Sequence, residues 1–215
     1  MHSLKWLAIL GLVSLSCLNI PLAINSYEIQ TGEVQFQDDF SDPSSGWARR
    51  YDENTGSLDY VNQGYQISVN QSHAILWSGP GLEFTDVQIE VDVTKIDGPE
   101  NDDFGIVCRA RDEHNFYFLI ISSDGYYGIG IVRDGIQQLI SMKNMPPSED
   151  IIQGQHTNHL RADCIDETLS LYVNGIHLVT VQDSEFTSGD VGLFAGTFDN
   201  PGTRVRFNKF SVLMP

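Results

Sequence analysis

Residues 104–132 constrain the fold of this chain more than any other stretch. They contain three apolar runs, separated by a polar break at residues 112–115 and by an Asp-Gly pair at residues 124–125. Short apolar runs joined by such breaks predict consecutive β-strands connected by tight turns. The first of these expected strands carries a cysteine, Cys108.

The rest of the chain repeats this pattern of short strands and turns. Residues 84–96 alternate most regularly, with valine and isoleucine on one face and polar residues on the other. The Asn-Gly pair at residues 174–175 is the strongest hairpin signal, because both residues tolerate positive φ. We count about thirteen expected strands and no sustained helical period. The sequence therefore predicts an all-β fold, an antiparallel β-sandwich of two sheets.

Residues 1–26 are interpreted as an export leader. Lys5 precedes an apolar run at residues 6–13, and small residues follow, as in a signal peptide. Residues 15–17, Leu-Ser-Cys, also resemble the end of a bacterial lipobox, with Ser14 where that motif has leucine, so lipidation of Cys17 is one alternative. An uncleaved membrane anchor is another. The domain then spans residues 27–215, and we expect it to be secreted, periplasmic or at the cell surface.

The charge of the chain limits its partners. Twenty-nine acidic residues against twelve basic ones give a formal net charge of −17. Such a charge repels phosphate backbones and anionic membrane surfaces. We therefore expect no nucleic-acid partner, and membrane contact only through the leader or a lipid anchor. The sequence contains no signal for an oligomeric state.

Two cysteines lie in the expected domain, Cys108 and Cys164. If the leader is removed, or Cys17 is lipidated, they are the only pair available. Each shares a strand face with apolar residues, so both point towards the core. A cysteine pair in an exported protein favours a disulfide, and two buried thiols are the alternative.

Four stretches carry a family resemblance. They are residues 38–47, which begin Asp-Asp-Phe-Ser-Asp-Pro and end in Trp47; the pair of strands at residues 104–120; residues 169–175, Leu-Ser-Leu-Tyr-Val-Asn-Gly; and the closing strands at residues 190–196 and 205–210. Together they resemble the concanavalin A-like lectin/glucanase jelly rolls, and most closely the laminin G-like and glycan-binding-module relatives. The resemblance implies two stacked curved sheets, with the polar concave face as the usual glycan platform.

The strand at residues 84–96 contains a possible catalytic pattern. Laminarinase-type glucanases of this superfamily carry three acids at alternate positions of one strand. Here Glu90 and Asp92 fill the first two positions, but Thr94 occupies the third. Without that general acid the leaving sugar oxygen is not protonated. We interpret the pattern as the solvated face of an amphipathic strand.

Arginine and aromatic residues give the candidates for ligand binding. Arg109 and Arg111 are expected on the face opposite Cys108, and Arg161 on the face opposite Cys164. Arginine forks and aromatic faces suit a hydroxyl-rich or carboxylate-bearing sugar. The candidate ligand-binding residues are Trp77, Arg109, Arg111, Tyr117, Tyr126 and Arg161. Pairing of Arg161 with Glu90 or Asp92 is the structural alternative.

No cofactor is required by any motif, but calcium is a candidate because many relatives of this fold bind it. The proposed oxygen ligands are Asp39, Asp42 and Asp102. Acidic solvated turns are the alternative. The six histidines form no ligand pair on one strand, which argues against zinc.

These patterns predict an exported, lectin-like binding domain whose partner is a glycan or polysaccharide and which is not an enzyme. One alternative is a structural or protein-interaction domain of the cell envelope. A less favoured alternative is an atypical glycoside hydrolase.

Overall fold

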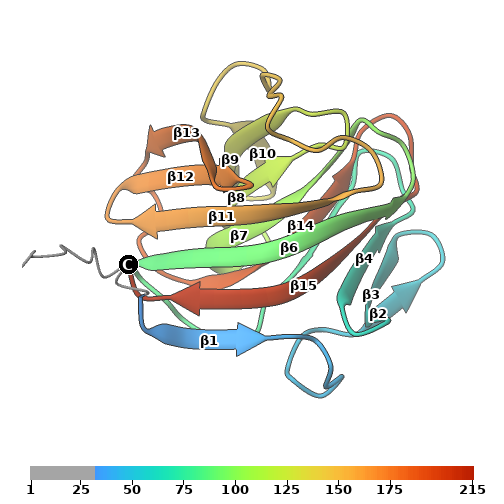
Figure 1. The fold of residues 1–215 in the computed structure, drawn as a ribbon, viewed down its shortest axis with the longest axis horizontal. Coiled ribbons are helices and arrows are strands. Elements are labelled where there is room, and N and C mark those ends of the chain that lie inside the picture. The colour runs from blue at the N-terminus through green and yellow to red at the C-terminus, as the bar shows by residue number, and fades with distance from the viewer. Residues whose placement is uncertain (1–31) are drawn as a thin grey trace, which may run out of the picture. The chain divides into compact units, whose positions relative to one another are not determined.

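The computed structural model describes residues 32–215, and these residues form fifteen β-strands (Figure 1). The leader, with Cys17, lies outside the described residues. Within residues 32–215 no helix is long and apolar enough to cross a membrane.

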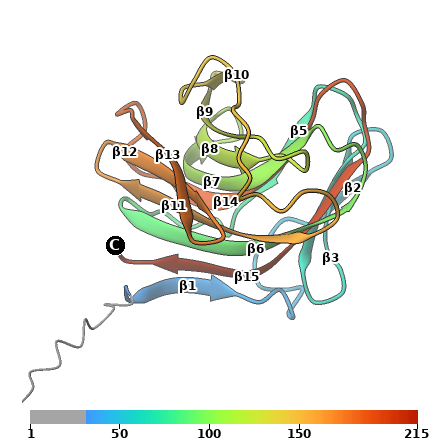
Figure 2. The ribbon, with the colours of Figure 1, turned by 45° about the horizontal axis from the view of Figure 1, so that its top comes forward.

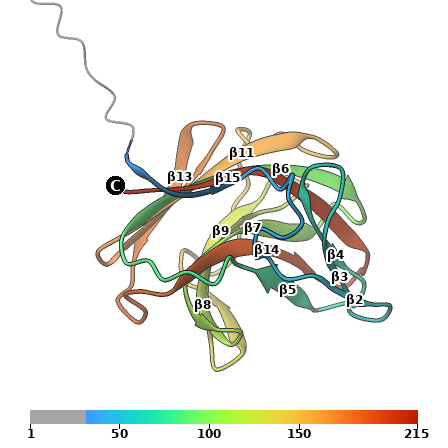
Figure 3. The ribbon, with the colours of Figure 1, turned by 90° about the horizontal axis from the view of Figure 1, so that it is seen from below.

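The strands form two antiparallel sheets, which stack face to face (Figures 2 and 3). The nine-stranded sheet has the order β13-β12-β11-β6-β15-β4-β3-β2, with β1 also paired to β15. Its members are β1 (Val34–Asp38), β2 (Arg50–Asp52), β3 (Gly56–Tyr60), β4 (Tyr65–Val69), β6 (Val87–Asp97), β11 (Thr157–Ile165), β12 (Thr168–Val173), β13 (Ile176–Gln182) and β15 (Thr203–Leu213).

The six-stranded sheet has the order β10-β9-β8-β7-β14-β5. Its members are β5 (Ile75–Ser78), β7 (Asp102–Asp112), β8 (Asn115–Ile121), β9 (Tyr127–Arg133), β10 (Ile136–Leu139) and β14 (Asp190–Thr197). The predicted all-β, two-sheet sandwich is confirmed. The three strands expected within residues 104–132 are β7, β8 and β9 in the middle of this sheet.

Strands were predicted best where one face is buried and the other is wet. Along β6 the buried and half-buried residues alternate without a break from Val87 to Ile96. The turn between β12 and β13 contains Asn174 and Gly175 with φ of 51° and 83°, as the Asn-Gly pair predicts. Strand β2 was missed, because its three residues are all exposed at a sheet edge and carry no alternation.

The core lies between the two sheets, and the opening stretch of the chain closes one end of it. Phe40, Trp47, Tyr65 and Phe210 pack as an aromatic cluster, with neighbouring ring centroids 5.0 to 5.6 Å apart. The Trp47 indole N–H donates to Asp38 Oδ2 at 2.9 Å, so the one polar atom of this ring is satisfied inside the protein. The stretch from Asp38 to Trp47 thus has a packing role.

Cys108 of β7 and Cys164 of β11 form a disulfide with an S–S distance of 2.09 Å. The two strands belong to different sheets. The bond therefore joins the sheets across the core, as the sequence predicted.

The expected alternation of β7 fails one residue after Cys108. The register with both neighbouring strands shifts there, and Arg109 has a φ of 53°. Such a β-bulge inserts one extra residue into the strand, so the side chains beyond it point to the opposite face of the sheet from the one expected. Val107 lies outward, as its alternation with Cys108 predicts, but after the bulge Ala110 also lies outward and the Arg109 side chain is 1% exposed. The prediction that Arg109 faces solvent is wrong for this reason.

The outward face of the six-stranded sheet is apolar. Phe116, Phe118 and Phe194 are fully buried there, and Leu139 and Met145 pack over them. This face therefore offers little polar surface. The wet face of the sandwich is the outward side of the nine-stranded sheet.

Candidate functional site

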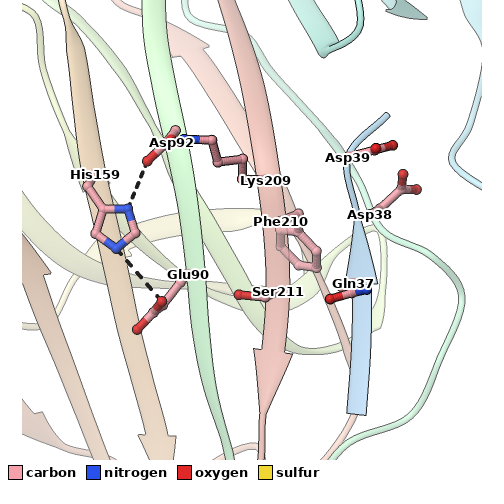
Figure 4. A pocket seen from close by; sticks show the side chains of 9 residues that line it. All are labelled: Gln37, Asp38, Asp39, Glu90, Asp92, His159, Lys209, Phe210 and Ser211. Carbon is pink, nitrogen blue, oxygen red and sulfur yellow. Dashed lines mark hydrogen bonds and ion pairs between the residues drawn. The ribbon is translucent and has the colours of Figure 1, made fainter. Parts of the chain in front are cut away.

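A polar groove runs along the outward face of the nine-stranded sheet (Figure 4). It has a volume of about 680 Å³, and a second hollow of about 590 Å³ shares Asp39, Asp92 and Lys209 with it. We treat the two as one site and call it the polar groove. Four strands supply its walls: β1, β15, β6 and β11. The residues of the first hollow are Gln37, Asp38, Asp39, Glu90, Asp92, His159, Lys209, Phe210 and Ser211.

Asp92 stands at the centre of the polar groove. One of its oxygens lies 2.8 Å from His159 Nδ1, and the other lies 2.9 Å from Lys209 Nζ. Partial burial acts to raise the pKa of Asp92, but the hydrogen bonds from Lys209 and His159 outweigh it and bring the pKa below its ordinary value. Asp92 is therefore a carboxylate at neutral pH, and His159 Nδ1 is the donor in their hydrogen bond.

Glu90 lies on the same face of β6, two residues before Asp92. Its Oε1 accepts a hydrogen bond from Gln88 Nε2 at 2.8 Å, and its Oε2 lies 3.9 Å from His159 Nε2. The pairing of β6 with β11 sets this arrangement, because it aligns His159 with Asp92. The imidazole thus lies between two carboxylates of one strand, as Figure 4 shows.

Carboxylates dominate the first hollow of the polar groove. Asp39, Glu90 and Asp92 share it with a single lysine, Lys209, and the histidine already described; Asp38 also lines it, but is buried and accepts from the Trp47 indole. Carboxylate oxygens accept hydrogen bonds and donate none. The groove is therefore suited to a ligand rich in hydroxyl donors and repels an anionic one.

Thr94 lies at the third alternate position of β6 and faces outward with Glu90 and Asp92, as predicted. Its hydroxyl is hydrogen bonded to that of Thr157 on the neighbouring strand β11, at 2.7 Å. The position that would hold a general acid in a glucanase is thus occupied by a paired hydroxyl.

Arg161 lies beside the polar groove and does not line it. The strand register aligns Arg161 with Glu90, as an ion pair between these two residues would require. Its guanidinium instead forms two hydrogen bonds to Asp163, at 2.7 and 2.8 Å. It also lies 4.7 Å from the centre of the Tyr172 ring. Because one polar edge and one face of the guanidinium are engaged, Arg161 is held in place by its own sheet.

Two of the predicted ligand-binding residues are buried. Arg109 donates to the carbonyls of Thr85 and Phe186 and to Asp86. Tyr117 is fully buried against Cys108, its register partner, and its hydroxyl donates to Asp183. Burial and that hydrogen bond raise the pKa of Tyr117 to about 12. The expectation that these two side chains face solvent is wrong.

The remaining candidates are dispersed. Arg111 is exposed, with its guanidinium 4.9 Å from the centre of the Phe186 ring. Tyr126 is 39% exposed in the turn between β8 and β9. Trp77 lies on β5, in the other sheet, where it lines a separate pocket. The structure therefore does not bring the six candidates into one site.

The proposed calcium ligands are not assembled either. Hydrogen bonds from the side chain and then the backbone N–H of Ser41 lower the pKa of Asp39, and those of Ser44 lower the pKa of Asp42 in the same way; both backbone bonds measure 2.9 Å. Asp102 is buried and lies 2.7 Å from Lys95 Nζ. Within residues 32–215 no group of three or more histidine, cysteine or acidic side chains could hold a metal ion. The predicted set of Asp39, Asp42 and Asp102 is therefore wrong as a single site.

His159 and Lys209 were missed as site residues. The six histidines form no ligand pair along the sequence, whereas in the structure His159 is the third residue of β11 and faces outward beside Asp92. Lys209 lies in a bulge of β15, with a φ of 55°, which breaks its alternation. The polar alternation of residues 157–163 could have indicated the first, but no local signal indicates the second.

No family model matches this sequence, and no curated protein does. Solved structures share its fold. The carbohydrate-binding module CBM66 from Bacillus subtilis superposes with a TM-score of 0.64 and 17% identity, over 79% of this chain and 96% of the module.

Two further structures are similar. A Bacillus subtilis protein of unknown function with a galectin-like fold gives a TM-score of 0.62 at 14% identity, over 86% of this chain and 97% of that one. The CBM2 module of the evolved Dit protein of Lactobacillus casei BL23 phage J-1 gives 0.59 at 11% identity, over 85% and 95%. The fold is thus a lectin-like sandwich shared with carbohydrate-binding modules.

Proposed function

We propose that this chain is an exported, non-catalytic lectin-like module that binds a neutral glycan in the polar groove. We also place it in the concanavalin A-like lectin/glucanase superfamily, on the resemblance of its opening, central and closing strands. The observation that carries the proposal is the row of carboxylates in the groove. The carbohydrate-binding modules among the structures of the same fold support the class of ligand.

The chemistry of the groove favours hydroxyl groups. Glu90 of β6 and Asp39 directly after β1 provide acceptors on opposite walls, while Gln37 of β1 and Ser211 of β15, the strand between, provide neutral donors. Sugar hydroxyls both donate and accept, so one ring can satisfy both kinds of partner. A uronic acid or sulfated sugar would bring its negative charge against four carboxylates. Neutral sugars are therefore the preferred class.

The same groups argue against glycoside hydrolysis. A general acid must hold a proton at working pH, whereas Lys209 and His159 keep Asp92 ionised. Thr94 carries a hydroxyl, hydrogen bonded to that of Thr157, and so supplies no carboxylic acid that could protonate a leaving group. Strand β6 therefore has no carboxyl at the third alternate position, where the laminarinase pattern places the general acid.

The proposed export of the chain is consistent with its disulfide and with a role as a binding module outside the cytoplasm. The leader of residues 1–26 would deliver the domain to an oxidising compartment, where the bond between Cys108 and Cys164 is stable. The module would act at the cell surface, in the periplasm or in the medium, either released or held through a lipid on Cys17.

The test is binding to an array of neutral and acidic glycans, followed by titration calorimetry with the best neutral ligand. Glu90→Gln and Asp39→Asn remove one carboxylate from each wall and keep the side-chain shape. Each should weaken binding about tenfold, because a hydrogen bond to a charged acceptor is lost. Glu149→Gln, an exposed acid in the segment after β10, is the matched control.

Two outcomes would overturn the proposal. Binding confined to acidic glycans would contradict the charge argument. Equal loss of affinity in Glu90→Gln and Glu149→Gln would place the ligand elsewhere.

A structural or protein-interaction domain is the second candidate, and the ion pairs that fill the sheet face beside the groove favour it. Arg161 is fixed by Asp163 and Tyr172, so that part of the face resembles a scaffold. Capture of an envelope protein that persists in excess neutral sugar and is lost in Arg161→Ala would support this candidate. Release of reducing sugar, abolished by Glu90→Gln, would instead establish a hydrolase.

A further inference from the structure

Trp77 belongs to a second pocket, at the edge of the sandwich, which β5 of the six-stranded sheet lines together with β2 and β3 of the nine-stranded sheet. It lies on β5, which is the edge strand of the six-stranded sheet next to β14. The pocket has a volume of about 410 Å³ and also includes Arg50, Glu113 and Asp190. It shares no residue with the polar groove. The two cavities are therefore separate features of the domain.

The Trp77 ring is held as a rigid platform. A Cβ on Gly192, in the neighbouring strand, would lie only 3.2 Å from Trp77 Cε3, so the absence of a side chain there lets the indole lie close against the sheet. The ring also packs on Phe116, with centroids 5.3 Å apart. These contacts fix the indole before any ligand arrives, which lowers the entropic cost of binding.

The Trp77 platform keeps part of its surface exposed. Elsewhere on this outward face Phe118 and Phe194 stack at 5.5 Å and are fully buried, because Leu139 and Met145 cover that part of the sheet. Trp77 is only partly buried. An aromatic ring that is fixed by its neighbours and still partly accessible provides a surface on which a sugar ring can stack its C–H groups.

Polar groups of the right kind border the platform. Arg50 of β2 and Glu113 of the turn between β7 and β8 are both exposed and carry opposite charges. Asp190 has a positioning role, since its carboxylate accepts hydrogen bonds from the backbone N–H groups of Gly81 and Leu82, at 2.9 and 3.0 Å. The pocket thus combines one aromatic face with a donor and an acceptor.

We propose that the Trp77 pocket is a second saccharide site, which takes one sugar ring stacked on the indole with its hydroxyls bound by Arg50 and Glu113. Because the Trp77 pocket shares no residue with the polar groove, one domain would then hold two glycan chains at once. Two linked sites raise the avidity for a polysaccharide without any further contact. This role goes beyond the proposed function, which needs the polar groove alone.

Intrinsic fluorescence provides a direct test, because Trp47 and Trp77 are the tryptophans of residues 32–215 and Trp47 is buried. The probes are glucose, galactose, mannose, xylose, fructose and N-acetylglucosamine, with their dimers. At least one should change the emission saturably, and Trp77→Phe should remove that change. In calorimetry Trp77→Ala should lower the affinity for the same sugar about tenfold.

Tyr51→Ala is the matched aromatic control, since Tyr51 is 80% exposed on the same short strand as Arg50 and lies outside the pocket. It should leave affinity unchanged. Glu90→Gln should leave the Trp77 signal intact, which separates this site from the polar groove. A panel in which no sugar alters the Trp77 emission would overturn the proposal, as would equal losses in Trp77→Ala and Tyr51→Ala. Trp77→Phe keeps an aromatic ring over Gly192, so its melting curve shows whether the fold is retained.

Discussion

Lys95 and Asp102 form an ion pair inside the sandwich, with Nζ 2.7 Å from Oδ2 and side-chain exposures of 2% and 0%. Lys95 belongs to β6 and Asp102 to β7, so the pair joins the two sheets. Ser123 assists both partners: its N–H donates to Asp102 Oδ1 and its hydroxyl accepts from Lys95 Nζ, each at 3.0 Å. Strand β7 is thus tied to the other sheet near its start by charge and at Cys108 by a covalent bond.

Removing one partner of this ion pair should destabilise the domain strongly. Lys95→Met leaves the Asp102 carboxylate buried without its cation, and we expect a loss of about 3–5 kcal/mol in the free energy of unfolding. The double variant Lys95→Met with Asp102→Leu should recover most of that loss, because neither charge remains. Urea unfolding measures both.

The control for that experiment is the surface pair between Arg49 and Asp59, whose side chains are 58% and 44% exposed. Arg49→Met should change the unfolding free energy by less than about 1 kcal/mol. A similar small effect in Lys95→Met would mean that the buried pair contributes no more than a surface one.

Asp103 should make the stability of the domain fall as pH rises. Burial, and then the nearby charge of Asp102, raise the pKa of Asp103 from 3.8 to about 7. An acid with a raised folded-state pKa ionises first in the unfolded chain, so the folded state loses stability as the pH rises from 3.8 to about 7. The loss from this group is at most about 4 kcal/mol.

The isosteric variant Asp103→Asn isolates this effect, since an amide does not ionise. At about pH 8 the free energy of unfolding of Asp103→Asn, measured in urea, should be markedly higher than that of the wild type. At about pH 4 the two free energies should differ much less. Asp134→Asn, in the exposed turn between β9 and β10, is the control and should show no such pH dependence. Parallel pH profiles for the wild type and Asp103→Asn would contradict the assignment.

Loss of the disulfide should also be costly. Cys108 and Cys164 are 56 residues apart, and in the chain-entropy model closing a loop of that length stabilises a protein by about 4 kcal/mol. The double variant Cys108→Ala with Cys164→Ala should lower the unfolding free energy by about that amount. It should keep the β-sheet circular dichroism at low temperature. A variant as stable as the wild type would show that packing alone holds β7 to β11.

Much of the fold could be predicted because its strands have one buried and one wet face. Residues 87–96 alternate without a break, and the hairpin at Asn174 and Gly175 depends on two adjacent residues. Both are local signals. The stacking of the two sheets is not local, yet it was constrained where a cysteine pair linked Cys108 to Cys164.

The candidate site was harder, because it depends on where alternation breaks. A bulge at Arg109 turned an expected outward side chain into the interior, and another bulge placed Lys209 beside Asp92. A bulge is set by contacts with neighbouring strands, and the sequence around it shows no break in its hydrophobic pattern. Glu90 and Asp92 were recognised correctly as an outward pair, but their partner His159 comes from a strand 67 residues away from Asp92.

Arg109 therefore gives the clearest comparison between the sequence and the structure. The sequence predicts that Arg109→Ala weakens glycan binding. The structure predicts a loss of about 2–4 kcal/mol in unfolding free energy instead, because its hydrogen bonds to Thr85, Phe186 and Asp86 disappear in the interior. Glycan affinity of the folded fraction should be unchanged. Arg109→Gly should be more stable than Arg109→Ala by about 1 kcal/mol, since glycine adopts the observed φ of 53° without strain. Urea unfolding and binding calorimetry of the two variants distinguish a structural role of Arg109 from a binding role. An Arg109→Ala variant that is as stable as the wild type but no longer binds glycan would contradict the structural role.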